Sequence, residues 1–262
     1  MLMNYMRKLA VSGLMALAVV ANVDANTSKK NTPSYITSRP VVQVFTIQVD
    51  PEKNEAFTTA TQDKITASLN AEKGTLAMFS LKGEGDLAYV VEVYANPEDY
   101  QTHLEGQAQQ TYNEQTQELV ENVQALRLAP QYVFDRKFTP SEQTLVKFER
   151  VSVKTEYLTD YRELVLQELQ QAVRNEPGIY AVYAANRMES PSEWLFITVY
   201  ADNQAFEKHG QQDYYLNYLE QSQEMLNSRE EVPVTVSLLM SKGKMRYNSL
   251  NDKTEFLDNP RQ

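Results

Sequence analysis

The sequence predicts an α+β protein built from two β-α-β-β-α-β units that pack sheet against sheet. Three observations lead to this prediction. The stretch NEPGIYAVY at residues 175–183 nearly repeats AEKGTLAMF at residues 71–79. Around both stretches the signals for strands and helices recur in the same order. The strands of both halves are apolar on both of their alternating faces, so each face needs a covering layer.

The repeat runs through most of the chain at two offsets. The first helix and strand of each half match at an offset of 104 residues, and the second helix matches at 106. The two histidines of the chain, His103 and His209, fall on each other, which chance would rarely produce. Other matched pairs are Val42 with Val146, Glu72 with Glu176, Gly74 with Gly178, Tyr100 with Phe206, and Tyr112 with Tyr218.

The first half supplies every element of one unit. Asp50 and Pro51 follow a β-rich run and are typical of a helix start. Apolar residues then recur at helical spacing until Gly74, where we expect a left-handed glycine to end the helix. Asn96 caps a second helix. The expected strands cover residues 41–49, 75–81, 87–94 and approximately 126–134.

The second half repeats this order with a more strongly apolar first helix. Gly178 is expected to end that helix, and Asp202 to cap the second one. The segment NRMESPSE is expected to join the two central strands. The strands after the first one are predicted at residues 179–185, 194–200 and approximately 232–240.

This order of elements is the ferredoxin-like arrangement, in which helices cover only one face of each sheet. The strand around Val91 and the strand around Ile197 are apolar on the other face as well. The simplest way to cover both bare faces is to press the two units together. One chain would then form an intrachain pseudo-dimer, which is compatible with a monomeric protein.

Composition narrows the possible chemistry. The 262 residues carry a formal net charge of −10, and no basic patch suggests binding to nucleic acid. The chain has no cysteine, so disulfides and thiolate chemistry are excluded. With only two histidines, a histidine-rich metal site within one chain is excluded as well.

The N-terminal segment has the pattern of a signal peptide. Arg7 and Lys8 precede an apolar run that is short for a membrane span, and Val23-Asp24-Ala25 resembles a cleavage site. We therefore expect a periplasmic or secreted protein that does not bind membranes after cleavage. The predicted organisation is a signal peptide at 1–25, a linker at 26–40, units at 41–137 and 144–242, and a polar C-terminal tail at 243–262.

The residues that mark the repeat resemble a known family. Glu72-Lys73-Gly74 and Glu176-Pro177-Gly178 end the first helices, and Glu92-Val93-Tyr94 precedes Tyr100 and His103. These motifs are similar to those of antibiotic biosynthesis monooxygenase (ABM) domains in the dimeric α+β barrel superfamily. The resemblance implies a dimeric α+β barrel fold, covers residues 41–137 and 144–242, and implies oxygenation of phenols or quinols without metal or flavin.

The chain departs from the family in informative places. In the second unit, Thr198 takes the place of the Glu of the E-x-Y motif. Ala108 and Tyr214 stand where many members have a second histidine. Haem-degrading relatives use an Asn on the first strand, which is absent here. The resemblance therefore does not extend to a haem-degrading site of the familiar kind.

The candidate catalytic residues are the matched pairs His103 with His209 and Tyr112 with Tyr218. In a straight helix Tyr112 would lie on the side opposite His103, so we expect the helix to bend near Gly106, and near Gly210 in the second unit. Each histidine is then either an acid–base group in a cleft or a histidine held at a helix–sheet junction by a backbone carbonyl. The expected pocket residues are Tyr94, Tyr200, Trp194 and Glu92.

Glu92 lies among apolar neighbours and needs a partner if it is buried. Lys147 and Arg150, on the first strand of the second unit, are the candidates. Three functions remain open: an exported oxygenase without a cofactor, a periplasmic protein that binds a planar apolar ligand such as haem, and a purely structural protein. In the first two the partner is a small aromatic or apolar ligand.

Overall fold

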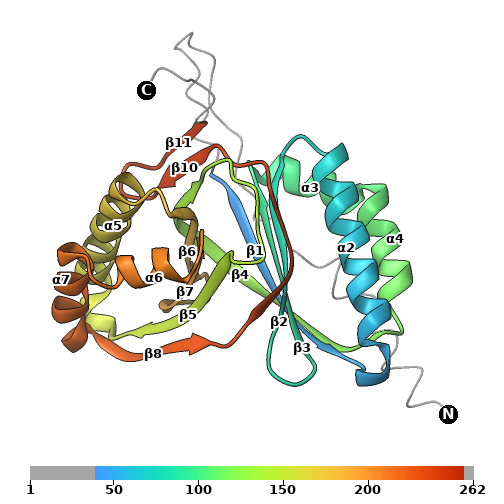
Figure 1. Cartoon of the computed structure of the whole chain (residues 1–262), viewed down its shortest axis with the longest axis horizontal. Helices are drawn as coiled ribbons and strands as arrows, with labels where there is room; N and C mark the ends of the chain where they lie inside the picture. Colours follow the sequence, from blue (N-terminus) through green and yellow to red (C-terminus); the bar gives the residue numbers. More distant parts are fainter. Residues whose placement is uncertain (1–38, 257–262) are drawn as a thin grey trace, which may run out of the picture.

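The computed structural model describes residues 39–256. The predicted signal peptide and nearly all of the predicted linker lie outside the described residues. Two sheets meet in the middle of the molecule, and helices cover both outer sides (Figure 1). The prediction of two ferredoxin-like units packed sheet to sheet is confirmed.

Both units follow the predicted order of elements. Unit one contains β1 (Val41–Val49), α2 (Asn54–Ala71), β2 (Thr75–Lys82), β3 (Leu87–Tyr94), α3 (Pro97–Glu105), α4 (Gln107–Thr116) and β4 (Val120–Asp135). Unit two contains β5 (Leu145–Val153), α5 (Leu158–Asn175), β6 (Ile179–Arg187), β7 (Ser190–Tyr200), α6 (Asn203–His209), α7 (Asp213–Ser222), β8 (Leu226–Val232) and β9 (Thr235–Ser241).

The prediction about the segment that joins the central strands of unit two was wrong. β6 and β7 extend through most of the NRMESPSE segment, because their ladder continues to the pair Arg187 and Ser190. The predicted polar C-terminal tail contains regular structure. It forms a hairpin of β10 (Met245–Asn248) and β11 (Lys253–Phe256), and β10 pairs with the end of β4.

Capping explains where the helices begin. The side chain of Asn96 accepts a hydrogen bond from the Asp99 amide at 2.8 Å, and Asp202 accepts one from the Ala205 amide at 2.8 Å. Asp50 accepts from the Glu52 amide at 3.1 Å, at the start of a short 3₁₀ turn (Pro51–Lys53) before α2. The predicted helix starts are therefore confirmed.

The two helix-ending glycines act differently from the prediction. Neither Gly74 nor Gly178 has a positive φ. A Cβ atom at Gly74 would lie 1.8 Å from Cγ of Asp99, and one at Gly178 would lie 2.7 Å from Cβ of Ala205. Glycine is required there because the next helix begins against the backbone, not because the helix ends in a left-handed turn.

The last strand of each unit joins the two sheets into one. β4 pairs with β1 through its first part, where Leu126 faces Val44, and with β6 through its second part, where Val133 faces Tyr183. β8 pairs with β5, and after Pro233 β9 pairs with β2. Each final strand therefore contributes to both units, and the strand order is β8-β5-β7-β6-β4-β1-β3-β2-β9.

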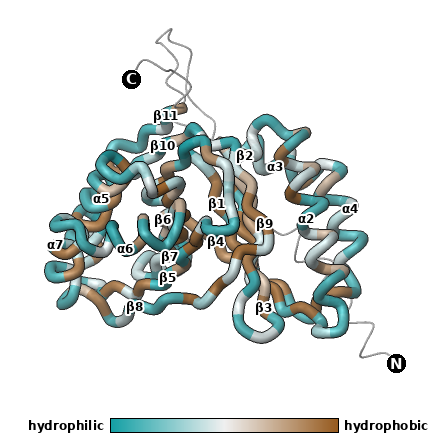
Figure 2. The backbone as a smooth tube through the Cα atoms, in the orientation of Figure 1, coloured by the Kyte–Doolittle hydropathy of each residue, from teal (hydrophilic) through white to brown (hydrophobic). Residues whose placement is uncertain are grey.

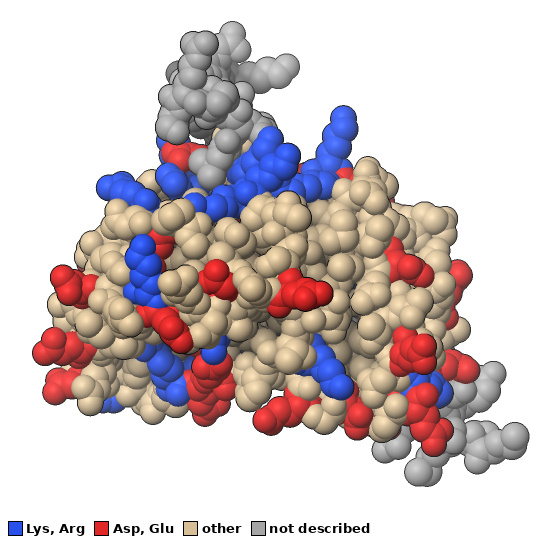
Figure 3. Space-filling view, in the orientation of Figure 1, with Lys and Arg blue, Asp and Glu red and all other residues tan. Residues whose placement is uncertain are grey.

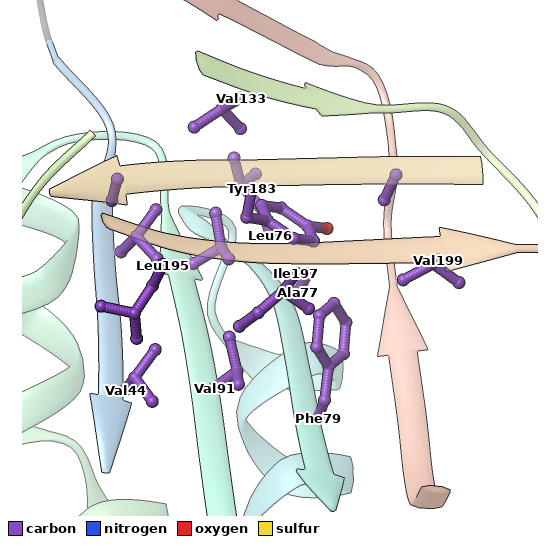
Figure 4. Packing of buried hydrophobic residues seen from close by; sticks show 14 of the residues in the cluster. Val44, Leu76, Ala77, Phe79, Val91, Val133, Tyr183, Leu195, Ile197 and Val199 are labelled. Carbon is purple, nitrogen blue, oxygen red and sulfur yellow. The ribbon is translucent and has the colours of Figure 1, made fainter. Parts of the chain in front are cut away.

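The helix-free faces of the two sheets form the central core. Phe79 of unit one packs on Tyr183 of unit two with ring centroids 5.4 Å apart, and Tyr89 packs edge-on against Phe148 at 5.2 Å. Figure 4 shows Val44 and Val91 facing Leu195 and other side chains of the opposite sheet. The hydrophobic positions in Figure 2 concentrate along these strands, whereas the outer helices alternate with hydrophilic positions. Burial of each large side chain contributes about 1.5–3 kcal/mol.

An asymmetric polar contact joins equivalent positions of the two units. Asp135 and Ser241 occupy equivalent positions at the ends of β4 and β9 and touch each other. Oδ2 of Asp135 accepts hydrogen bonds from the Ser241 hydroxyl at 2.7 Å and the Tyr183 hydroxyl at 2.5 Å. Burial raises the pKa of Asp135 to about 7. In an assembly of identical units this position would bring two like side chains together, so the contact depends on the difference in sequence between the two units.

Charge is unevenly distributed on the surface. On the face in Figure 3, Lys and Arg gather along the upper rim near β10, while Asp and Glu are spread over the helices and the lower rim. Lys73, Lys137, Lys242 and Lys244 line an open hollow of about 640 Å³ at this rim. Within residues 39–256, no helix is long and apolar enough to cross a membrane.

Candidate functional site

A break in the second helix of each unit places the histidine against the sheet. In unit one, α3 ends at Glu105 and α4 begins at Gln107, so the predicted bend at Gly106 is a change of helix. His103 is fully buried. Its Nδ1 lies 2.8 Å from Oε2 of Glu72 and its Nε2 lies 3.0 Å from Oε1 of Gln109, so both ring nitrogens have polar partners.

The histidine of unit two is held by the equivalent glutamate. Nδ1 of His209 lies 2.8 Å from Oε1 of Glu176, and the Tyr214 hydroxyl donates to the same oxygen. The Glu of each E-x-G motif therefore orients the histidine of the following helix. Nε2 of His209 faces a further carboxylate, Oε1 of Glu168, at 3.8 Å.

A buried ion pair fills most of the space between the helices and the sheet of unit one. Nζ of Lys64 lies 2.5 Å from Oε1 of Glu92, and the Tyr94 hydroxyl donates to Oε2 at 2.6 Å. Burial acts to raise the pKa of Glu92, but the Lys64 ammonium and other contacts outweigh it and the pKa is lowered. The ammonium also lies 4.7 Å from the centroid of the Tyr112 ring. The remaining cavity measures only about 10 Å³.

The predicted partners of Glu92 were wrong. Lys147 pairs instead with Glu231 at 2.7 Å, and Arg150 lies over the Phe148 ring at 5.9 Å. Lys64 escaped prediction because it occupies a helix face that otherwise buries Phe57, Ile65 and Leu69. A lysine at helical spacing normally indicates a solvent-facing position.

At the equivalent positions unit two has a different pair of side chains. Glu168 stands where unit one has Lys64, and Thr198 stands where it has Glu92. The cation comes from strand β8 instead, where Arg229 replaces Val123. The Arg229 guanidinium lies 4.9 Å from the Tyr218 ring centroid and donates to its hydroxyl.

Glu168 and Arg229 do not form an ion pair with each other. Oε1 of Glu168 and Nε of Arg229 are buried atoms without a hydrogen-bond partner. Burial raises the pKa of Glu168 to about 7, although His209 acts to lower it. Both residues line a cavity of about 40 Å³. Its lining also includes Lys147, Glu149, Phe196, Thr198, Tyr200, Phe206, His209, Tyr215 and Tyr218.

The tyrosines of the two units also differ in their contacts. The Tyr218 hydroxyl lies 2.9 Å from the Tyr161 hydroxyl, in addition to its contact with Arg229. Tyr112, its counterpart, accepts only a 3.3 Å hydrogen bond from Thr61 among the described contacts. Tyr218 is therefore part of a polar network that Tyr112 lacks, and burial raises the pKa of both hydroxyls.

Trp194 lies outside this cavity. It is 2% exposed, stacks on Phe196 with centroids 5.7 Å apart, and meets Tyr161 edge-on at 5.4 Å. Its Nε1 has no hydrogen-bond partner within the described structure. Of the predicted residues, His209, Tyr218 and Tyr200 come together in unit two, and Glu92 and Tyr112 line the much smaller cavity of unit one.

Sequence reasoning missed Glu168 and Arg229. Glu168 could have been found by aligning the two halves of the sequence. In that alignment Lys64 corresponds to Glu168, and Glu92 corresponds to Thr198. The charge is reversed at one position of a buried site and lost at the other, which indicates that the halves differ in their chemistry. Among residues 39–256, no group of three or more His, Asp or Glu side chains could hold a metal ion.

The fold and site define a tandem α+β barrel protein with two unequal pockets between helices and sheet. The antibiotic biosynthesis monooxygenase family model matches residues 40–115 and 145–221, and the chain belongs to that family. No curated protein matches the sequence.

Two solved structures share the fold over both units. A candidate monooxygenase from Lactobacillus acidophilus is 21% identical, with a TM-score of 0.75 over 80% of this chain and 99% of that chain. Another from Fusobacterium nucleatum subsp. nucleatum is 22% identical, with a TM-score of 0.76 over 81% of this chain and 99% of that chain. At these identities the likeness shows the tandem fold.

Proposed function

We propose that unit two binds the hydroxyl of a phenol or quinol between Glu168 and Arg229 and promotes its oxygenation by O₂ without a cofactor. The observation behind this proposal is that Glu168 and Arg229 line one cavity, and that Oε1 of Glu168 and Nε of Arg229 are buried without a hydrogen bond. Their nearest charged neighbours, His209 at 3.8 Å and Glu149 at 3.9 Å, are beyond hydrogen-bond distance. A hydroxyl is both a donor and an acceptor, so it would complete both groups. Family membership supports the reaction class.

The reaction begins with transfer of the hydroxyl proton to Glu168. A carboxylate with a pKa of about 7 is well matched to this role at neutral pH. Arg229 stabilises the resulting phenolate. The phenolate gives one electron to O₂, and the substrate radical and superoxide combine into a peroxide anion at a ring carbon that carries hydrogen. The proton held by Glu168 converts this anion into a hydroperoxide and restores the carboxylate. Loss of water leaves a quinone, so one oxygen atom enters the product and the other leaves as water.

The size of the cavity dictates how the substrate enters. A cavity of about 40 Å³ has room for a few water molecules but not for an aromatic ring. It accommodates the reacting hydroxyl, while the ring requires outward movement of the half-buried side chains of Phe206 and Tyr215. Tyr218 and His209 then border the reacting atoms.

Unit one serves as the structural partner in this proposal. Its equivalent space is filled by the Lys64–Glu92 ion pair, and the remaining 10 Å³ is too small for a ligand. The haem-binding alternative has no observation in its favour, because both nitrogens of His103 have polar partners and those of His209 face carboxylates.

Oxygen uptake with a panel of hydroquinones and naphthoquinols tests the proposal. We expect Glu168→Gln to lower the enzymatic rate about 100-fold or more, and the wild-type rate to rise as pH increases through about 7. Glu163→Gln, at an exposed position of the same helix, is the matched control and should leave the rate unchanged. No uptake above the buffer rate with any quinol, or equal rates in Glu168→Gln and wild type, would refute it.

A further inference from the structure

Unit one contains a second, larger cavity on the helix side of its sheet. It measures about 250 Å³ and lies between α2 and the β2–β3 hairpin. It shares no lining residue with the small cavity beside Glu92. Its floor consists of the buried residues Phe57, Ser80, Leu81 and Ala88, and its rim contains Asn54, Glu55, Thr58, Thr59, Lys82, Gly85, Leu87 and Ser237.

In unit two an indole ring fills the corresponding place. Ala88 pairs with Ile47 on β1, and Trp194 pairs with Val151 at the equivalent register of β5. Phe57 likewise corresponds to Tyr161, which the Trp194 ring meets edge-on at 5.4 Å. The exchange of tryptophan for alanine therefore opens the space in unit one.

The rim of the cavity is open for a related reason. Thr58 corresponds to Arg162, whose guanidinium in unit two donates to Oε1 of Gln131 at 2.9 Å and to the Ser249 carbonyl at 2.8 Å. The hydrogen bond to Ser249 connects helix α5 to the turn of the C-terminal hairpin, which lies over the corresponding place in unit two. The Thr58 hydroxyl instead bonds its own helix, at the Asn54 carbonyl, at 2.8 Å. The short side chain leaves access to the floor.

We infer that this cavity binds a small planar aromatic molecule of about the size of indole, with its ring against Phe57 and Ala88. Unit two demonstrates that the fold accepts such a ring at this place. An apolar floor left empty destabilises a protein, so a ligand that covers it gains free energy from burial. The inference does not depend on the proposed function, because the two sites share no residues.

Ser80 adds a preference for a polar edge on the ligand. It corresponds to Ala184 in unit two, where the Trp194 Nε1 has no hydrogen-bond partner. Ser80 therefore places a hydroxyl on the floor where unit two has only a methyl group. An aromatic ring with an N–H or O–H group is favoured over a hydrocarbon, because it can bond this hydroxyl.

Isothermal titration calorimetry and ligand-observed NMR with indole test the inference on the whole chain. We expect saturable binding to one site with a dissociation constant of about 1 mM or below, as for a good fragment-sized ligand. Ser80→Ala should weaken binding several-fold. Glu168→Gln, in the other unit, should bind indole as tightly as wild type does.

Ala88→Trp places the residue of unit two into unit one and should abolish indole binding while keeping or raising the thermal midpoint. Thr58→Arg, which reproduces the rim of unit two, should weaken binding at least tenfold and serves as the deciding variant if Ala88→Trp does not fold. The inference is overturned if indole fails to saturate the wild-type protein, or if the folded variants bind it unchanged.

Discussion

Removal of the Lys64 ammonium should expose how strongly unit one depends on its internal ion pair. Lys64 and Glu92 are 5% and 1% exposed, and their charged atoms are 2.5 Å apart. In Lys64→Met the Glu92 carboxylate keeps only the Tyr94 hydroxyl as a partner and must be neutralised by a proton. The free energy of unfolding therefore falls by the cost of protonating an ordinary glutamate.

That cost can be worked out from the pH. An ordinary glutamate has a pKa of about 4.3, so protonation at pH 7 costs about 4 kcal/mol, at about 1.4 kcal/mol per pH unit. At pH 5 the cost is only about 1 kcal/mol. Lys64→Met should thus be severely destabilised at pH 7 and only mildly destabilised at pH 5. Glu92→Gln added to Lys64→Met keeps an acceptor for Tyr94 without a charge, and should recover most of the loss.

Urea denaturation followed by circular dichroism at pH 5, 6 and 7 measures these differences. Lys53→Met is the matched control, because Lys53 forms an exposed pair with Asp50 at 2.8 Å and should show no measurable change. A loss below about 1 kcal/mol at pH 7, or the same loss at pH 5 and pH 7, would refute the reasoning about Glu92.

Three further predictions concern unit two and the helix junctions. Burial raises the folded-state pKa of Glu168 to about 7, so between pH 4 and 7 the folded state holds a proton that the unfolded state releases, and the free energy of unfolding falls as pH rises. Glu168→Gln should flatten this dependence on pH in denaturation curves, and an unchanged dependence would contradict the prediction. Gly74→Ala brings a Cβ to 1.8 Å from Asp99 and should lower the thermal midpoint by several degrees; an unaltered midpoint would show that α3 can shift freely. Tyr218→Phe should lower the free energy of unfolding by about 1–3 kcal/mol in urea denaturation. The loss should exceed that of Tyr112→Phe, because the Tyr112 hydroxyl makes one long hydrogen bond, and equal losses would argue against the network.

The sequence determined the architecture because the architecture depends on local and periodic signals. The offset of the two histidines, the caps at Asn96 and Asp202, and the strands that are apolar on both faces define two units that must cover each other. Each signal acts within a few residues or repeats along the chain. No knowledge of distant contacts is needed to interpret them.

The chemistry of the pockets was decided by the tertiary structure. Glu92 could have paired with a cation on any facing element, and only the packing of α2 on the sheet selects Lys64. The joint placement of Glu168 and Arg229 depends on how α5 lies over strand β8, which no spacing in the sequence encodes. Gly74 likewise owes its identity to Asp99 of the following helix. Side chains that meet across separate elements are positioned by the packing of those elements, so their partners emerge only with the fold.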